Sequence, residues 1–168
     1  MSVDVAARDA FRWWRFLPGM AMREPSEIEG ALDRMATSAT ACSPTVKFIL
    51  GFGQYFRGAP LPPGIARGHP KECYANAAAL ALNDDSLGYA EGYAYNNELQ
   101  WPFLHAWCIR DGRVVDNTLR HPGDFDYLGI LIPKMRLIEN ERETGTYGVL
   151  TGELGAKFMA DWGKFGPR

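Results

Sequence analysis

One stretch of the chain decides the fold: Leu104-His105-Ala106-Trp107-Cys108-Ile109-Arg110-Asp111-Gly112-Arg113-Val114-Val115-Asp116-Asn117-Thr118. The runs 104–110 and 113–118 are rich in β-branched and aromatic residues, which favour strands. Between them stands Asp111-Gly112, and this dipeptide is the strongest two-residue signal for a β-hairpin. The stretch therefore predicts two antiparallel strands joined by a tight turn.

The register of this hairpin brings a histidine and an aspartate together. With a two-residue loop, Trp107 faces Asp116, and His105 lies two positions before Trp107 on the same face. Diagonal neighbours on one face are about 7–8 Å apart at the backbone, which an imidazole and a carboxylate together can span. Asp116 would then orient His105 and leave its other ring nitrogen to deprotonate a nucleophile. Taken singly, His105 also fits a half-buried structural histidine, and Asp116 a turn or capping acid.

The nucleophile comes from an upstream helix, expected over 70–83, where proline stands at the first position and alanine and leucine follow. Cys73 falls in its first turn, where unpaired N–H groups and the positive end of the helix dipole favour a thiolate. Lys71 adds positive charge nearby, and Glu72 opposes it. The alternative is a buried, inert cysteine, because free cysteines are often buried. Cys108 faces the opposite side of the hairpin and is expected to fill the core.

Four short segments resemble the core of transglutaminase-like proteins in the papain-like superfamily. Within residues 70–118 they are Glu72-Cys73-Tyr74, Tyr89-Ala90-Glu91-Gly92-Tyr93-Ala94, His105-Ala106-Trp107 and Val114-Val115-Asp116-Asn117-Thr118. The resemblance implies an α+β fold in which a catalytic helix packs on a small antiparallel sheet, in a bacterial or phage member of the superfamily. It also implies a triad of Cys73, His105 and Asp116. The family usually has proline after its aspartate, where this chain has Asn117.

The resemblance implies chemistry in which a thiolate attacks a carbonyl group and forms a thioester. We expect a peptidase or amidase acting on a peptide or protein amide, because a small open cleft needs special features to exclude water. A transglutaminase, deamidase or acyltransferase on the same triad is the alternative. A second alternative is a non-catalytic protein-binding module, such as a phage- or host-directed inhibitor. No cofactor is expected.

Three further side chains are candidates for supporting roles. Gln54 is a candidate second donor to an oxyanion, since papain-like enzymes often place a glutamine upstream; otherwise it is an exposed polar residue. Asn76 lies on a neighbouring face of the helix and is expected to hold the active-site loop or its own surroundings. Trp107 is expected beside the His/Asp pair. His69, four residues before Cys73, lacks the paired short-spaced ligands of zinc sites, so no metal is expected.

The rest of the chain is expected to complete one domain, with a helical or irregular N-terminal lobe over 1–65 and the catalytic core and C-terminal elements over 66–168. Ser26 and Glu29 form a capping-box pattern that starts a helix. The thin face of the strand at 87–95, made of alanine and glycine, is expected to accept the alanine-rich helix. The first helix is expected to end near 37–40, and at 45–56 a strand is favoured over a helix. A further strand is expected at 128–132 and a helix from 151. Trp13, Trp14 and Phe16 are expected to dock on the core.

Composition and charge exclude several classes of protein. The chain has 168 residues, 46% of them hydrophobic and 23% charged, which is typical of a globular domain. A net charge of -2 gives no bulk attraction to nucleic acid or anionic membranes. Residues 1–17 lack the apolar core of a secretory signal, and no apolar run reaches the ~18 residues that span a membrane. The three separated cysteines form no disulfide framework, so a cytoplasmic location is expected.

Overall fold

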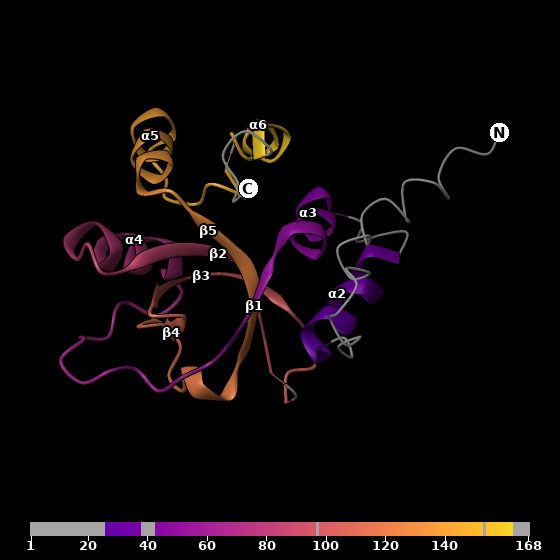
Figure 1. The fold of residues 1–168 in the computed structure, drawn as a ribbon, viewed down its shortest axis with the longest axis horizontal. Coiled ribbons are helices and arrows are strands. Elements are labelled where there is room, and N and C mark those ends of the chain that lie inside the picture. The colour runs from indigo at the N-terminus through magenta and orange to yellow at the C-terminus, as the bar shows by residue number, and fades with distance from the viewer. Residues whose placement is uncertain (1–25, 38–42, 97, 153, 163–168) are drawn as a thin grey trace, which may run out of the picture.

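A computed structural model of the chain describes residues 26–37, 43–96, 98–152 and 154–162 (Figure 1). These residues form an α+β fold, which confirms the expected class. The helices are α2 (Glu27–Thr37), α3 (Pro44–Phe52), α4 (Cys73–Asn83), α5 (Lys134–Thr144) and α6 (Gly155–Asp161), and the strands are β1 (Gln54–Arg57), β2 (Gly88–Tyr95), β3 (Phe103–Arg110), β4 (Arg113–Val115) and β5 (Asp126–Ile132). Cys42 and the tryptophans at 13 and 14 lie outside the described residues.

The five strands form one antiparallel sheet in the order β1-β5-β2-β3-β4. The sheet is curled, since the two edge strands β1 and β4 come back into contact with each other. Strand β1, from the expected N-terminal lobe, therefore belongs to the same sheet as the hairpin. Helix α4 packs on β2 and β3, whereas α2 and α3 pack on β5 (Figure 1).

Each face of the sheet has its own apolar cluster. The outer face carries Tyr89, Tyr93 and Cys108 against the helices, and the inner face carries Trp107 and Tyr127 among smaller residues. We expected α4 to pack on the thin face of β2, and this was wrong. The alanines of α4 already supply a small surface, so the helix packs against the bulky face. The thin inner face instead makes room for aromatic rings.

A glycine shows how tightly the inner face is filled. A Cβ atom on Gly129 of β5 would lie 2.5 Å from Cη2 of Trp107, which is closer than two carbon atoms can approach. Trp107 therefore lies directly over the backbone of β5, and its ring also meets Phe56 of β1 at 6.2 Å between centroids. This packing joins β1, β5 and β3 across the inside of the curl.

The predicted hairpin register is confirmed, with Cys108 paired to Val115 and Arg110 to Arg113. Asp111 and Gly112 both have positive φ, 51° and 73°, as the expected two-residue turn requires. Strand β4 ends at Val115 rather than at residue 118. It ends there because the side chain of Asp116 accepts hydrogen bonds from backbone N–H groups that follow it, and the chain turns away.

Helix α4 begins at Cys73 rather than at residue 70. Pro70 and Lys71 form a turn, and Lys71 has a φ of 68°, a left-handed conformation that no α-helix accommodates. Cys73 is thus the first residue of the helix. The expected place of Cys73 in the first turn is confirmed, and the turn before it is tighter than the sequence pattern indicated.

The segment 45–52 is helical, so the strand expected there was wrong. Ser43 caps the helix by accepting from the N–H of Thr45, and Pro44 occupies its first turn. The buried positions include Thr45 and Phe48 as well as Val46 and Ile49, a spacing that suits a helix. Only the end of the expected strand is extended, as β1.

The other expected elements are present with shifted bounds. Glu29 accepts from the N–H of Ser26 at 2.7 Å, as the capping box predicts, and α2 ends at Thr37. Strands β2 and β5 match the expected strands, and the terminal helix is the short α6. Helix α5 was not predicted; it is strongly charged and ends at Thr144, and Gly145, with a φ of 70°, caps its C-terminal end.

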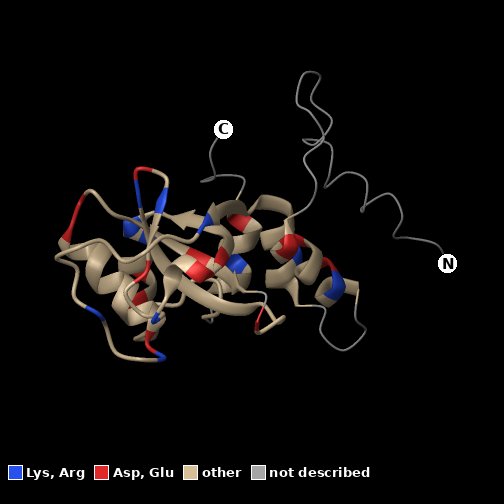
Figure 2. Cartoon of the chain, turned by 90° about the horizontal axis from the view of Figure 1, so that it is seen from below, with Lys and Arg blue, Asp and Glu red and all other residues tan. Residues whose placement is uncertain are grey.

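Acidic and basic residues are interspersed over the described part of the chain (Figure 2). None of the described helices has the length and apolar character needed to cross a membrane.

Candidate active site

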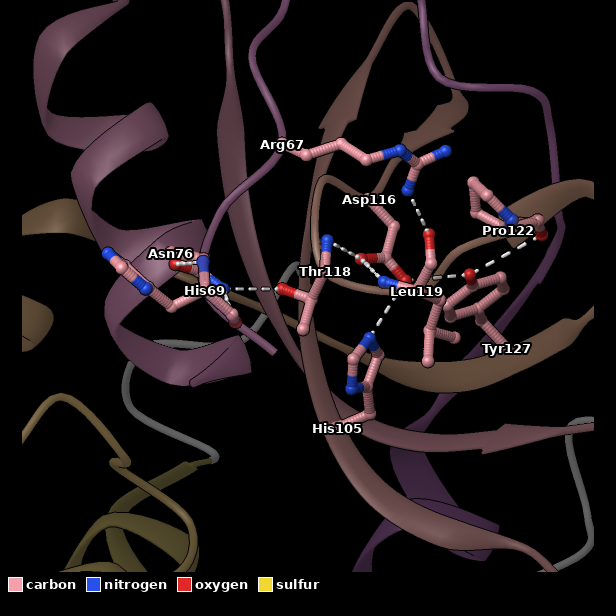
Figure 3. Close-up of polar contacts among 9 residues, drawn as sticks. All are labelled: Arg67, His69, Asn76, His105, Asp116, Thr118, Leu119, Pro122 and Tyr127. Atoms are coloured by element: carbon pink, nitrogen blue, oxygen red, sulfur yellow. Dashed lines mark hydrogen bonds and ion pairs between the residues drawn. The ribbon is translucent and has the colours of Figure 1, made fainter. Parts of the chain in front are cut away.

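The predicted histidine–aspartate pair is formed. His105 Nε2 lies 2.8 Å from Asp116 Oδ2, and the two side chains are 3% and 1% exposed (Figure 3). His105 extends from β3 onto the inner face, and Asp116 is the first residue after β4. Because Nε2 is bound to Asp116, Nδ1 is the ring nitrogen that remains for another partner.

Asp116 is held as a carboxylate by four donors. Its Oδ2 accepts from His105 and from the hydroxyl of Tyr127 at 2.9 Å, and its Oδ1 accepts from the N–H groups of Thr118 and Leu119 at 2.8 and 3.2 Å (Figure 3). Burial alone would raise the pKa of Asp116, but its hydrogen bond to His105 and the charge of His105 hold the pKa below its usual range. The group is therefore a fixed, buried negative charge.

Tyr127 is a residue of this site that the sequence pattern did not single out. It lies in β5, is fully buried, and donates to Asp116 from the strand two places away from β3. Its ring is tilted against that of His105, with 6.2 Å between centroids. In the sequence, Tyr127 could be placed only on the same face of its strand as Gly129. Without the strand order, nothing indicated that this face is the one that carries His105.

Cys73, the first residue of α4, is the third member of the predicted triad. It lies close enough to His105 for its side chain to raise the pKa of the imidazole. Cys73 belongs to neither apolar cluster and is 9% exposed, whereas Cys108 is fully buried. Strand β4 pairs with β3 only from Cys108 to Arg110, so it does not cover the part of β3 that carries His105.

The pKa of His105 reflects these contacts. Burial lowers the pKa of His105, but the hydrogen bonds to Asp116 and Cys73 and their charges outweigh burial and raise it from 6.5 to about 9. His105 is therefore an imidazolium at neutral pH. A positive imidazole held by a buried carboxylate can donate a proton to a leaving group.

Asn76 holds the loop before α4 in place, as expected. Its Oδ1 accepts from the N–H of His69 at 3.1 Å, and its Nδ2 donates to the carbonyl of His69 at 2.8 Å and to the hydroxyl of Thr118 at 3.0 Å (Figure 3). The N–H of Gly68 donates to the carbonyl of Asn117 at 2.9 Å. These bonds tie the start of α4 to the segment that carries Asp116.

The other two supporting candidates have different positions. Gln54 is exposed at the start of β1, and the register from Gln54 through Gly129 and Gly92 to His105 puts it on the same face of the curled sheet as His105. Trp107 is fully buried and its ring stacks beside His105 at 15° and 6.3 Å, so it supports the imidazole by packing. The oxyanion donors that remain nearest the thiol are the unpaired N–H groups of the first turn of α4.

A groove of about 350 Å³ lies at the start of α4. It is lined by Glu72 and Tyr74, the neighbours of Cys73 in sequence, and by Ala75, Thr146, Tyr147, Gly148, Thr151 and Gly152. Across the described ranges, no three His, Cys, Asp or Glu side chains gather as a metal site would need.

No protein-family model, curated protein or solved structure matches this chain.

Proposed function

We propose that this protein is a cysteine-dependent acyl-transfer enzyme, in the first instance a peptidase or amidase that works through a thioester. One observation supports this most: His105 is bound through Nε2 to the buried Asp116 and is in contact with Cys73, the first residue of a helix. The order of these residues along the chain agrees with the transglutaminase-like, papain-like pattern that the sequence resembles.

In the first half of the reaction, the thiolate of Cys73 attacks the carbonyl carbon of an amide. The C–S bond forms as the carbonyl electrons move to oxygen, and N–H groups at the start of α4 stabilise that oxyanion. The oxyanion then collapses, His105 gives its proton to the leaving nitrogen, and the C–N bond breaks. The products are an amine and a thioester on Cys73.

In the second half, His105 is neutral and takes a proton from water as the water oxygen attacks the thioester. The C–S bond breaks, the acid leaves, and the thiolate and imidazolium are restored. If an amine replaces water, the same steps give transamidation or acyl transfer, and if the amide is a glutamine side chain, hydrolysis is deamidation. Asp116 keeps its charge throughout and stabilises the imidazolium.

The test is the reactivity of Cys73 toward iodoacetamide at about pH 6, where an ordinary thiol with a pKa near ~8.5 reacts slowly. Peptide mapping by mass spectrometry gives the rate at Cys73, with the buried Cys108 as an internal control. We expect fast modification of Cys73 that is lost in His105→Ala. Slow modification of Cys73 in the folded protein would instead favour a non-catalytic protein-binding module.

A further inference from the structure

The groove at the start of α4 is lined in part by the segment 146–152, and a buried acid binds the backbone of this segment, which is called the wall below. Glu91 of β2 is fully buried, and its Oε1 accepts from the N–H of Val149 at 2.7 Å while its Oε2 accepts from the N–H of Leu150 at 2.8 Å. Its Oε1 also accepts from the hydroxyl of Tyr89 at 2.8 Å. One side chain of the sheet therefore pairs two successive backbone groups of the wall.

A second buried side chain fixes the same wall from α5. Asn140 donates through Nδ2 to the carbonyl of Thr146 at 2.8 Å and to that of Gly148 at 3.4 Å. Glu91 thus accepts hydrogen bonds from N–H groups of the segment 146–150, and Asn140 donates to carbonyls of the same segment. A loop whose backbone is paired by two buried side chains keeps one conformation, as a binding surface requires.

The wall is also shaped to leave the groove open. A Cβ on Gly148 would lie 2.5 Å from Oγ1 of Thr151 and 3.4 Å from the ring of Tyr74. A larger residue at 148 would push the side chain of Thr151, which lines the groove together with Tyr74. The absence of a side chain at this position therefore keeps the groove open.

The chemistry of the lining indicates what the groove accepts. Its side chains are those of tyrosines, threonines and an alanine, and Glu72 alone carries a charge. An acidic group there would meet Glu72, and any charged group buried against the tyrosines without a partner would be costly. An uncharged side chain of moderate size suits this lining best.

We propose that this groove binds the uncharged side chain of the residue that supplies the reacting carbonyl, and that Glu91 is the positioning residue that holds its wall. This proposal rests on the proposed function, because the groove gains its meaning from the thiol between Glu72 and Tyr74. Glu91 does not touch the reacting atoms; it acts through Val149 and Leu150.

Both protonation states of Glu91 are compatible with this role. The ionised carboxylate accepts from Tyr89; the protonated one can donate to the oxygen of Tyr89, whose hydroxyl then donates to the carbonyl of Tyr147, 3.3 Å away. The N–H groups of Val149 and Leu150 keep their acceptors in either state. A glutamine at 91 cannot accept from both of these N–H groups, because its side chain ends in one acceptor oxygen and one donor nitrogen.

The test compares N-acetylated chloromethyl ketones of norleucine, lysine and glutamate with iodoacetamide, which is too small to need the groove. The rate of Cys73 modification is followed by mass spectrometry in wild type, Glu91→Gln, Gly148→Ala and the control Glu143→Gln on the exposed side of α5. In wild type we expect the norleucine reagent to react about tenfold faster than the glutamate reagent, a ratio equivalent to about 1.4 kcal/mol.

In Glu91→Gln and Gly148→Ala we expect the half-saturating concentration of the norleucine reagent to rise about tenfold, as the loss of one hydrogen bond to a buried group allows. The maximal rate, the iodoacetamide rate and all rates of Glu143→Gln should stay unchanged. Hydrogen exchange should quicken at Val149 and Leu150 in Glu91→Gln alone.

Four outcomes overturn the proposal. If the glutamate reagent modifies Cys73 as fast as the norleucine reagent, the groove does not prefer uncharged side chains. If the half-saturating concentration of the norleucine reagent is unchanged in both variants, the groove does not bind this side chain and Glu91 does not position its wall. An equal loss of iodoacetamide reactivity in the two variants would show a general structural effect instead. If Cys73 of wild type does not react with iodoacetamide at all, the proposed function fails, and this proposal fails with it.

Discussion

Replacement of Asp116 by asparagine removes one charge from the site and leaves its shape. The amide can still meet the N–H of Thr118, but it no longer supplies a negative partner for the imidazolium of His105. Burial, the largest influence on His105, then acts with less opposition and lowers its pKa. We expect the pKa of His105 to fall from about 9 by at least about one unit, which is about 1.4 kcal/mol.

The same change alters how stability depends on pH. Because the pKa of His105 is raised from 6.5 to about 9 in the folded protein, its contribution to the free energy of unfolding is complete below pH 6.5 and is lost as pH rises through about 9. Two and a half units correspond to at most about 3–4 kcal/mol. In Asp116→Asn this loss should be smaller and should occur at lower pH.

The assay is an NMR titration of the histidine ring protons from about pH 5 to about pH 10, with denaturant unfolding at both ends of the range. His69 and His121 are exposed and serve as internal references. Asp124→Asn, at an exposed aspartate, is the matched control and should leave His105 unchanged. A pKa of His105 near 9 in folded Asp116→Asn would refute the assigned pairing.

The remaining predictions concern single residues. Cys73→Ala should abolish all thiol-dependent turnover. Its free energy of unfolding should stay within about 1 kcal/mol of the wild-type value, because the substitution at a helix start removes little packing. Turnover in this variant would exclude Cys73 as the nucleophile. Cys108→Ser should keep turnover, since its Sγ donates to the carbonyl of Ala77 on the face away from His105 and a hydroxyl can do the same; loss of turnover in a folded variant would contradict the hairpin register. Asn76→Ala should lower the free energy of unfolding by about 2 kcal/mol, because it leaves backbone groups of His69 unpaired, and should slow alkylation of Cys73; unchanged alkylation would separate the loop from the thiol. The pKa of Glu91 is raised by burial from 4.5 to about 7, so its contribution to stability is complete below pH 4.5 and is lost as pH rises through about 7, and Glu91→Gln should remove that loss in unfolding curves.

The parts of the site that the sequence predicted are those set by local rules. Asp111-Gly112 specifies a two-residue turn, the turn specifies the register, and the register puts His105 and Asp116 on one face. The place of Cys73 at a helix start also follows from nearby residues. Each of these steps needs only a few neighbouring positions of the chain.

The parts that could not be predicted depend on contacts between distant segments. Tyr127 donates to Asp116 because β5 pairs with β2 rather than with another strand, and no short pattern specifies that order. Glu91 was visible only as one bulky position in an alternating strand; its role depends on the return of residues 149 and 150 to the sheet. The strand expected at 45–56 was wrong for a different reason, since Ser43 and Pro44 start a helix whose residues include several β-branched and aromatic ones.

The early end of β4 has a consequence for how the molecule avoids self-association. A strand edge with free backbone groups is a template for another chain, and many proteins must protect such edges. Here the segment 66–69 binds the chain that leaves β4: Gly68 donates to the carbonyl of Asn117, and the guanidinium of Arg67 donates to the carbonyls of Leu119 and Arg120, each at 2.6 Å. The loop that leads to the nucleophile therefore also occupies backbone acceptors of residues 117–120 that another chain could otherwise bind.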